Sequence, residues 1–270
     1  MSELFAREDA ASWIALPTDD DDKYTRGVVG FVTGSARFPG AAVLGVDAAL
    51  RTGVGMVRYL GPGRPTRLVL QRRPEAVTAE GRVQAWVLGS GWDTSRKIDE
   101  LTKMVLEPAL ENPVPTVLDA GALPRWAEFG GPLVLTPHER EFARLRASVG
   151  LGAAGEDREA AVAETAQALG CVVLLKGAET LVLSPASGLL RVRNATPWLA
   201  TAGAGDALAG ILGALVATHA AAADLAPVAA AAAWIHGEAA RRASDGGPFV
   251  ILDLCAAIPG VVRDLATMSA

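Results

Sequence analysis

The feature of the sequence that most constrains the fold is a repeated alternation along the chain. Short runs of valine, leucine and isoleucine alternate with longer segments rich in alanine, leucine, arginine and glutamate, and turn residues separate the two. Strands of a parallel sheet read as continuous apolar runs, because helices cover both faces of such a sheet. The alternation therefore predicts an α/β fold with a mostly parallel sheet covered by helices.

This pattern predicts seven strands and seven helices. The expected strands are Val28–Thr33, Met56–Leu60, Ala85–Leu88, Thr116–Asp119, Leu133–Thr136, Val172–Lys176 and Thr180–Ser184. The expected helices are Ala41–Thr52, Ser95–Glu111, Glu139–Ala147, Arg158–Leu169, Gly205–Thr218, Asp224–Ala243 and Leu252–Leu265. Since no repeat or linker divides the sequence, we expect residues 1–270 to form one domain.

Composition excludes several classes of protein. Half of the 270 residues are hydrophobic and 20% are charged, which rules out a disordered or collagen-like chain. The 25 basic and 30 acidic residues give a net charge of -5 without a long basic run, so nucleic acid is not an expected partner. The acidic run Asp19–Asp22 indicates a solvated loop, because ligands of a metal must converge in space.

Three features bear on the compartment. Residues Met1–Trp13 show no signal peptide, since no apolar segment follows a basic start. The longest apolar stretch, Ala207–Ala223, is too short to span a membrane and favours a buried core helix. Cys171 and Cys255 lie far apart without metal-ligand spacing, which favours buried free thiols. We therefore expect a cytoplasmic protein with no membrane partner.

The predicted strands end in polar residues or glycine. Such ends are Thr33-Gly34-Ser35, Gly89-Ser90-Gly91, Asp119-Ala120-Gly121 and Thr136-Pro137-His138. Ligands of open α/β sheets bind outside the carboxyl ends of the strands. A binding site is therefore expected at this edge of the sheet.

The segment Thr201–Gly210 runs from small residues and glycines straight into an apolar helix. Its backbone N–H groups would face outward at a helix N-terminus, where the helix dipole favours an anion such as phosphate. Asp206 in the first turn could simply complement that dipole. Beside a phosphate, its carboxylate could instead accept the proton of a hydroxyl that attacks a phosphoryl group.

Two further segments carry candidate site residues. In Val173–Thr180, a strand ends in Lys176 and Gly177 and turns into a second strand, a shape that can hold a nucleotide through backbone groups and a cation. A lone lysine at a strand end can equally be a solvated residue. In Leu133–Phe142, His138 stands at a strand-to-helix junction three residues before Glu141, where it is either a helix-start residue or a ligand contact.

Taken together, these motifs resemble the ADP- or ATP-dependent NAD(P)H-hydrate dehydratases, a ribokinase-like family that repairs nicotinamide nucleotides. The resemblance runs in order along nearly the whole chain. It rests on Lys23–Gly27, Gly34-Ser35, Phe38–Ala41, Arg51–Gly55, Val117–Ala120, Thr136–His138 with Glu141-Phe142, Lys176–Ala178 and Gly203–Gly210. It implies a ribokinase-like three-layer αβα fold with a mostly parallel central sheet, and no fused epimerase domain.

The resemblance also implies the reaction and the site. The reaction would dehydrate (S)-NADHX and (S)-NADPHX, the hydrates of NADH and NADPH, at the expense of ADP or ATP, with Mg²⁺ screening the nucleotide phosphates. The substrate pocket would be lined by Ala41, Gly91, His138 and the catalytic Asp206. The adenine nucleotide would contact Lys176, Gly177, Ala178, Glu179, Thr180, Gly203, Ala204 and Gly205. Metal ligands are not assigned, and a homotetramer and a separate epimerase acting on the same hydrates are expected.

The sequence departs from the family pattern at three positions. Gly121 replaces a second aspartate, Asp93 follows a glycine motif beside the expected phosphate path, and Ala204 stands within the glycine turn. Two alternatives therefore stay open: a small-molecule kinase of the ribokinase superfamily, which stops after phosphoryl transfer, and a nucleotide-binding protein without catalysis.

Overall fold

The computed structural model describes residues 3–93, 100–111 and 113–269. Nine strands form one sheet in the order β1-β9-β8-β7-β6-β5-β4-β2-β3. They are β1 (Glu3–Leu4), β2 (Val28–Val32), β3 (Met56–Tyr59), β4 (Ala85–Leu88), β5 (Thr116–Leu118), β6 (Leu133–Leu135), β7 (Val172–Leu175), β8 (Thr180–Leu183) and β9 (Leu190–Val192). Neighbouring strands run parallel except at β7–β8 and β8–β9, so the predicted mostly parallel sheet is confirmed.

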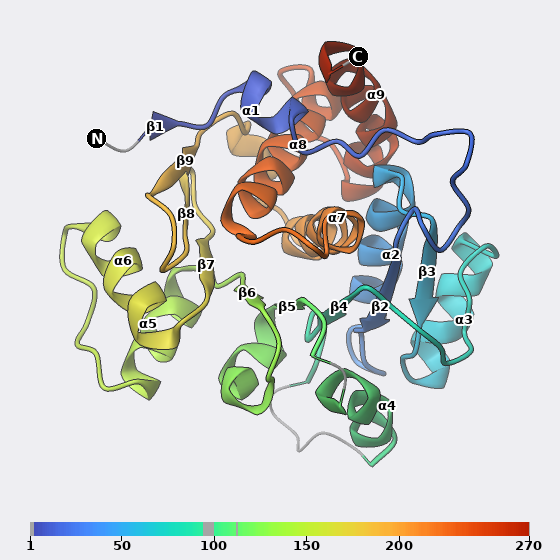
Figure 1. Ribbon diagram of the computed structural model, residues 1–270, viewed down its shortest axis with the longest axis horizontal. Coiled ribbons are helices and arrows are strands. Elements are labelled where there is room, and N and C mark those ends of the chain that lie inside the picture. Colours follow the sequence, from blue (N-terminus) through green and yellow to red (C-terminus); the bar gives the residue numbers. More distant parts are fainter. Residues whose placement is uncertain (1–2, 94–99, 112, 270) are drawn as a thin grey trace.

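Helices cover both faces of this sheet and make three layers (Figure 1). The α-helices are α1 (Arg7–Ala11), α2 (Gly40–Thr52), α3 (Gly63–Arg72), α4 (Glu100–Glu111), α5 (Glu139–Ser148), α6 (Arg158–Leu169), α7 (Ala204–Thr218), α8 (Ala226–Ser244) and α9 (Ile251–Ser269). Two 3-10 helices are η1 (Ala120–Glu128) and η2 (Pro197–Leu199). Figure 1 shows α1, α2, α7, α8 and α9 on one face, and α4, α5, α6 and η1 on the other.

Side-chain alternation along the strands divides the core into two. Val29 and Phe31 of β2 belong to the cluster packed under α2, α7, α8 and α9, whereas Val28 and Val32 belong to the cluster that contacts α4, α5 and α6. Successive side chains of a strand point to opposite faces, so each buried strand feeds both clusters. The face on which a residue lies is therefore fixed by its position along the strand.

Helix α7 forms the centre of the layer that it shares with α2 and α8. Its residues from Ala207 to Ala217 are buried, as expected for a core helix. A Cβ built on Gly210 would come within 2.2 Å of the Gly45 carbonyl oxygen in α2, so the two backbones touch. Among the described residues, no helix is both long and apolar enough to cross a membrane.

All seven predicted strands are present, with ends within about one residue of those expected. The predicted helices are present as well, although residues 95–99 of one lie outside the described part of the chain. The sequence patterns did not predict β1, β9, α1, α3 or the two 3-10 helices. Most of these elements are short. Helix α3 begins at Gly63, has a proline two residues later and carries few buried side chains.

The free cysteines behave as expected. Cys171 and Cys255 are both buried and unoxidised. Burial raises the pKa of each thiol to about 12, with the charge of Asp47 adding to the effect at Cys255. Thiols of this kind are poor nucleophiles, so these cysteines serve packing rather than chemistry.

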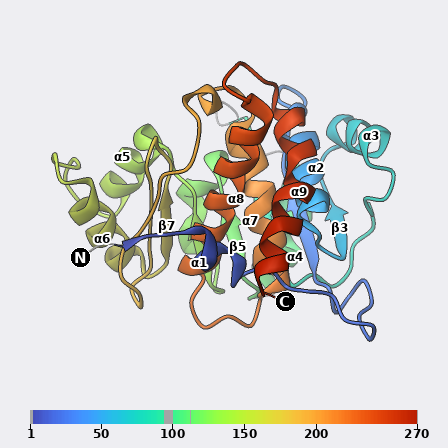
Figure 2. The same cartoon turned by 90° about the horizontal axis from the view of Figure 1, so that it is seen from above.

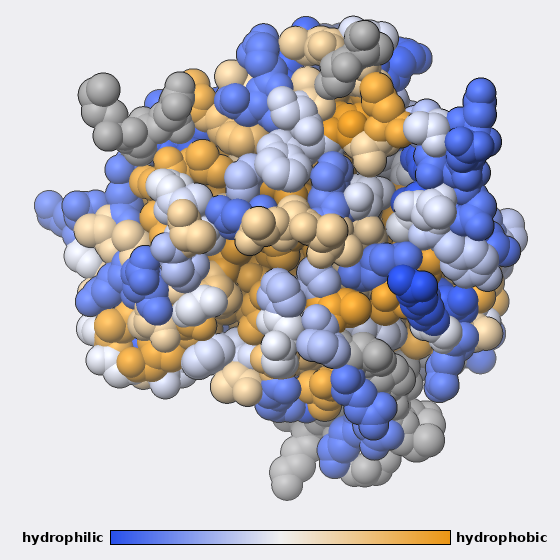
Figure 3. Space-filling model, viewed as in Figure 1, coloured by the Kyte–Doolittle hydropathy of each residue, from blue (hydrophilic) through white to orange (hydrophobic). Residues whose placement is uncertain are grey.

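Figure 3 shows the molecular surface on the side seen in Figure 1. Hydrophilic residues cover much of the periphery of this face, and hydrophobic residues gather toward its centre.

Candidate active site

The alternation of the strands places three polar residues together at the carboxyl edge of the sheet. Asp119, Thr136 and Lys176 each follow a strand by one residue. Each continues the side of its strand that faces α7, because Val117, Val134 and Leu174 two residues earlier pack in that cluster. In Figure 2 the C-terminus and the α7–α8 connection lie at the opposite edge from the α8–α9 connection.

Asp119 is the buried centre of this group. It is 3% exposed, and its carboxylate accepts hydrogen bonds at 2.8 Å from each of Ser90 Oγ, Thr136 Oγ1 and Lys176 Nζ. Burial acts to raise the pKa of Asp119, but the Lys176 charge and the three hydrogen bonds outweigh it and hold the pKa below its usual value. Asp119 is therefore a carboxylate anion within the protein.

Lys176 joins this carboxylate to the N-terminus of α7. Its Nζ also lies 4.0 Å from Glu141 Oε2 of α5. A Cβ built on Gly205 would lie 3.6 Å from Nζ, so the ammonium group stands beside the first turn of α7. Burial acts to lower the pKa of Lys176, but Asp119, Glu141 and Asp206 together raise it. The side chain remains a cation, 20% exposed.

The glycine turn before α7 has the conformation that the sequence predicts. Gly203 is the N-cap of α7 with φ +93°, a left-handed backbone that favours glycine. A Cβ there would also come within 2.5 Å of Leu44 Cδ1. The turn leaves the first N–H groups of α7 without helical partners, which makes the helix N-terminus a suitable site for an anion.

Asp206 lies in the first turn of α7 and is partly exposed. Burial raises the pKa of Asp206 to about 7; the negative charge of Asp119 adds to this effect, and Lys176 opposes it. A carboxylate with a pKa near neutral is a better proton acceptor than an ordinary surface aspartate. This property goes beyond complementing a helix dipole.

The predicted substrate residues Ala41 and Gly91 are in direct contact. Gly91 has φ +71°, and a Cβ built on it would approach Ala41 Cβ to 2.5 Å. Ala41 lies at the start of α2, whose Gly45 in turn packs against the backbone oxygen of Asp206. The structure therefore brings Ala41, Gly91 and Asp206 into one region.

His138 lies at the other side of this edge as the N-cap of α5. Its Nδ1 accepts hydrogen bonds from the N–H groups of Arg140 and Glu141, and the Glu141 carboxylate accepts from the His138 N–H at 2.9 Å. This confirms the helix-start interpretation. The imidazole is half exposed and its Nε2 lies 3.4 Å from Glu141, so a ligand contact remains a prediction.

The turn between β7 and β8 carries the other predicted nucleotide contacts. Gly177 lies next to Arg158, whose guanidinium would be 3.0 Å from a Cβ built there. Glu179 is engaged by Arg191, which donates to both carboxylate oxygens at 2.9 and 3.1 Å. Thr180 begins β8. The backbone of Gly177 and Ala178 thus lies beside Lys176, whereas the Glu179 side chain already has a strong partner.

The departures noted in the sequence have local explanations. Asp93 lies 3.7 Å from Arg37, so its charge has a nearby counter-charge. The N–H of Gly121 donates to the Gly89 carbonyl, directly after Ala120 in a left-handed conformation of φ +46°. Ala204 is the first residue of α7, where a methyl group is compatible with the helix.

Four residues of this group lie within the sequence motifs, but the motifs predict no role for them at the site: Asp119, Ser90, Thr136 and Glu141. The strand alternation is the signal that identifies two of them, Asp119 and Thr136. Counting two residues on from the last buried side chain facing α7 leads to Asp119 on β5 and Thr136 on β6.

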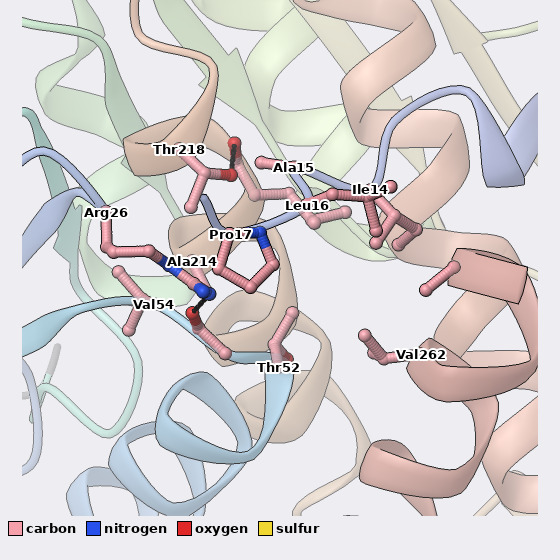
Figure 4. A pocket seen from close by; sticks show the side chains of 13 residues that line it. Ile14, Ala15, Leu16, Pro17, Arg26, Thr52, Val54, Ala214, Thr218 and Val262 are labelled. Atoms are coloured by element: carbon pink, nitrogen blue, oxygen red, sulfur yellow. Dashed lines mark hydrogen bonds between the residues drawn. The ribbon is translucent and has the colours of Figure 1, made fainter. Parts of the chain in front are cut away.

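A separate cavity of about 150 Å³ lies at the amino ends of the strands and does not belong to this site (Figure 4). Its lining combines the segment from Ile14 to Pro17 with parts of α7 and α9 and is mostly apolar. It includes Arg26, whose Nη2 donates to the Gly53 carbonyl at 2.5 Å. The arginine is thus held by backbone just before β3, away from the charged group around Asp119.

Solved structures identify the fold class. An ADP/ATP-dependent NAD(P)H-hydrate dehydratase of Bacillus subtilis, co-crystallised with ATP and Mg²⁺, superposes with a TM-score of 0.84 at 24% identity, covering 98% of this chain and 99% of that one. A ribokinase-like superfamily protein of Enterococcus faecalis V583 gives 0.85 at 19% identity, covering 98% and 96%. The chain therefore has the expected ribokinase-like three-layer fold.

Sequence comparison then identifies the family. A family model described as NAD(P)H-hydrate dehydratase matches residues 29–255. An ADP-dependent (S)-NAD(P)H-hydrate dehydratase of Neisseria meningitidis serogroup B is 36% identical over 240 residues, covering 82% of this chain and 79% of the relative. The chain belongs to the NAD(P)H-hydrate dehydratase family.

Other relatives are longer than this chain. A bifunctional NAD(P)H-hydrate repair enzyme of Mycobacterium tuberculosis strain H37Rv is 41% identical over 225 residues, covering 79% of this chain. The match covers only 45% of that relative, and 51% of the corresponding enzyme of Mycobacterium leprae. The chain thus spans about half the length of these curated relatives.

Proposed function

We propose that this protein dehydrates (S)-NADHX and (S)-NADPHX to NADH and NADPH, and that it uses ADP or ATP as the phosphoryl donor. The observation that carries the proposal is the arrangement of Asp206, with its pKa raised to about 7, at an anion-binding helix N-terminus beside the Lys176 ammonium group. Membership of the dehydratase family supports the same reaction.

The first step assigns a proton acceptor and a phosphate site. Asp206 accepts the proton of the ring hydroxyl while the hydroxyl oxygen attacks the terminal phosphoryl group of the nucleotide. The bond between that phosphorus and its bridging oxygen breaks, which releases AMP from ADP or ADP from ATP. The N–H groups of Gly203 to Asp206 and the Lys176 ammonium stabilise the charge on the moving group.

The second step eliminates phosphate from the phosphorylated hydrate. The lone pair of the ring nitrogen expels the phosphate, which leaves with the electrons of the carbon–oxygen bond. Loss of a ring proton then restores the dihydronicotinamide. Phosphorylation is needed because hydroxide is a poor leaving group and phosphate is a good one.

The binding residues divide between the two ligands. Ala41, Gly91 and His138 line the pocket for the hydrated dinucleotide, together with Asp206. The turn Lys176–Thr180 and the glycine turn Gly203–Gly205 hold the adenine nucleotide, mainly through backbone groups and the single ammonium. The packing of Gly91 on Ala41 supports the substrate side, since it leaves little side-chain bulk between the strand tips and α2.

Mg²⁺ is part of the proposal as a partner of the nucleotide phosphates. Within residues 3–93, 100–111 and 113–269, no cluster of three or more His, Cys, Asp or Glu side chains is arranged to hold a metal ion. We therefore expect phosphate oxygens and water, rather than a cage of the described side chains, to supply the ligands. We also expect a cytoplasmic homotetramer that works alongside an NAD(P)H-hydrate epimerase.

The test incubates purified protein with NADH hydrate, Mg²⁺ and either ADP or ATP, and follows the dihydronicotinamide absorbance while AMP or ADP and phosphate are assayed. We expect nucleotide-dependent recovery of NADH, and its loss by about 100-fold or more in Asp206→Asn. The conservative change Asp253→Asn in α9 serves as the control and should keep full activity.

Three outcomes would contradict the proposal or a part of it. A phosphorylated acceptor that accumulates without elimination would identify a ribokinase-superfamily kinase. Nucleotide binding without turnover of the hydrates or of any other hydroxylated acceptor would identify a binding protein without catalysis. Turnover by Asp206→Asn within a few-fold of the unaltered protein would remove Asp206 from its role.

A further inference from the structure

We propose that Asp119 is a positioning residue that holds the Lys176 ammonium at the N-terminus of α7 and keeps it from pairing with Asp206. This inference rests on the proposed function, because it assigns the work of Lys176 and Asp206 to the same reaction. Asp119 itself touches neither ligand in this scheme; it acts through Lys176.

The geometry shows why Lys176 needs a holding group. The N-terminus of a helix carries a partial positive charge, which repels a cation placed beside it. Lys176 Nζ nevertheless stands beside Gly205 in the first turn of α7. Its 2.8 Å contact with Asp119 is shorter than the 4.0 Å contact with Glu141, so Asp119 provides the principal counter-charge.

Asp119 is itself fixed and has little capacity left for a ligand. One oxygen accepts from both Thr136 and Lys176, and the other accepts from Ser90. These donors come from the ends of three other strands, so the carboxylate cannot turn without breaking several hydrogen bonds. A buried carboxylate that is saturated in this way orients its partners and does not react.

In our proposal, Asp119 prevents an ion pair between Lys176 and Asp206, as the charges around Asp206 indicate. The charges that act on Asp206 are those of Lys176 at the end of β7 and Asp119 at the end of β5. His236 of α8 is buried and is linked to the backbone of Ala204, two residues before Asp206. The first turn of α2, which packs against α7, contributes only Gly40 to Val43 and no charged group. Among the described residues, Lys176 forms ion pairs with Asp119 and Glu141 and none with Asp206.

Removal of the Asp119 charge would take away the principal ion-pair partner of Lys176. Glu141 is already hydrogen-bonded to the backbone of His138, so it is a weaker competitor for the ammonium. Among the described residues whose charge acts on Lys176, the third carboxylate is that of Asp206. An ion pair between Lys176 and Asp206 would make Asp206 a weaker base and would withdraw the cation from the phosphate site.

The experiment measures the titration of Asp206 by carboxyl ¹³C NMR in the nucleotide-free full chain, with Asp206→Asn used to assign the signal. Asp119→Asn should move this titration to lower pH, and the shift should be larger when Lys176 is present than in the Lys176→Met background. The control variant Thr136→Val removes one hydrogen bond from Asp119 but keeps its charge, and should leave the Asp206 titration in place.

Activity gives a second readout. Asp119→Asn should lower kcat at pH 8 by roughly tenfold or more, and the loss should largely disappear in the Lys176→Met background, since two residues of one network do not act additively. Asp119→Ser, which is smaller and keeps an oxygen, serves the same comparison where Asp119→Asn fails to fold.

The proposal would be overturned if Asp119→Asn shifted the Asp206 titration equally with Lys176 present and in the Lys176→Met background. Such a result would show that Asp119 acts on Asp206 only by direct charge repulsion. The proposal would also be overturned if the fold-losses in kcat of Asp119→Asn and Lys176→Met multiplied in the double variant. The NMR titration needs no turnover, so it decides the role of Asp119 even where the unaltered protein fails to dehydrate the hydrates and the proposed function falls.

Discussion

Gly210 of α7 lies against the backbone carbonyl of Gly45 in α2, so closely that a Cβ on Gly210 would come within 2.2 Å of the carbonyl oxygen. This contact sets the spacing of the two helices whose first turns carry Ala41 and Asp206. Helices approach one another this closely only where side chains are absent from the contact. The position of the candidate site therefore depends on two glycines that are not themselves proposed to bind a ligand.

The first prediction concerns this helix contact. Gly210→Ala should destabilise the protein by about 1–3 kcal/mol, because the added methyl group forces α2 and α7 apart. Gly260→Ala in α9 is the matched control, since a Cβ there meets only arginine side chains at ordinary distances of 3.5 Å or more. The measurement is urea unfolding, and equal midpoints for the two variants would show that the helices can separate without cost.

The second prediction separates the two glycines of the turn before α7. Gly203→Ala should lose stability, because its φ is +93° and its Cβ would meet Leu44 at 2.5 Å. Gly205→Ala should fold normally but bind nucleotide more weakly, because its methyl group would lie 3.6 Å from Lys176 Nζ, where a phosphate is expected. Calorimetric titration with ADP and thermal unfolding distinguish these effects. Full nucleotide affinity in Gly205→Ala would place the phosphate elsewhere.

The third prediction links Asp206 to stability. Its pKa is raised to about 7 in the folded protein, against 3.8 as the ordinary value, so the folded state binds more protons between these pH values. Stability contributed by this group therefore falls as pH rises from about 4 to 7. Without nucleotide, Asp206→Asn should be more stable than the unaltered protein at pH 8, with the gain shrinking toward pH 4. A gain of equal size at both pH values would contradict the raised pKa.

The fourth prediction concerns His236 of α8, which is 6% exposed. Burial lowers the pKa of His236 to about 4; a hydrogen bond to the Ala204 backbone opposes this shift, and the Lys176 charge adds to it. The unfolded chain binds the extra proton between about 4 and 6.5, so the folded state loses stability as pH falls through this window. His236→Gln should reduce that loss, as measured by urea midpoints at several pH values. If His236→Gln left the dependence of the urea midpoint on pH unchanged, His236 would take up its proton in the folded protein as readily as in the unfolded chain.

Much of the fold followed from the sequence because the buried strands have a strong signal. Runs such as Val172–Leu175 are apolar at every position, and a sheet covered by helices buries both of their faces. The two-residue strand β1 and the strand β9, which carries Arg191, lack that signal and depend on the tertiary context of the sheet. Helix α3 was missed for a similar reason, since only Pro65 and Val69 in it are buried.

The candidate site was predictable at its individual motifs but not in its connections. Asp206 and Lys176 stand out as residue types at strand and helix ends, and the structure places them at one edge. That Asp119 accepts hydrogen bonds from Lys176, Thr136 and Ser90 depends on the strand order β7-β6-β5-β4. Strand order is a property of the assembled sheet, and the sequence motifs carry no direct record of it.

The hydrogen bonds at Asp119 also make the site an indicator of complete folding. Its donors come from the ends of β4, β6 and β7, and the helix that carries Asp206 follows β9. A partly folded chain that lacks any one of these strands has no assembled carboxylate group and no ordered phosphate site. Nucleotide should therefore protect the backbone amides of the whole central sheet from hydrogen exchange, rather than those of the nearest loops alone.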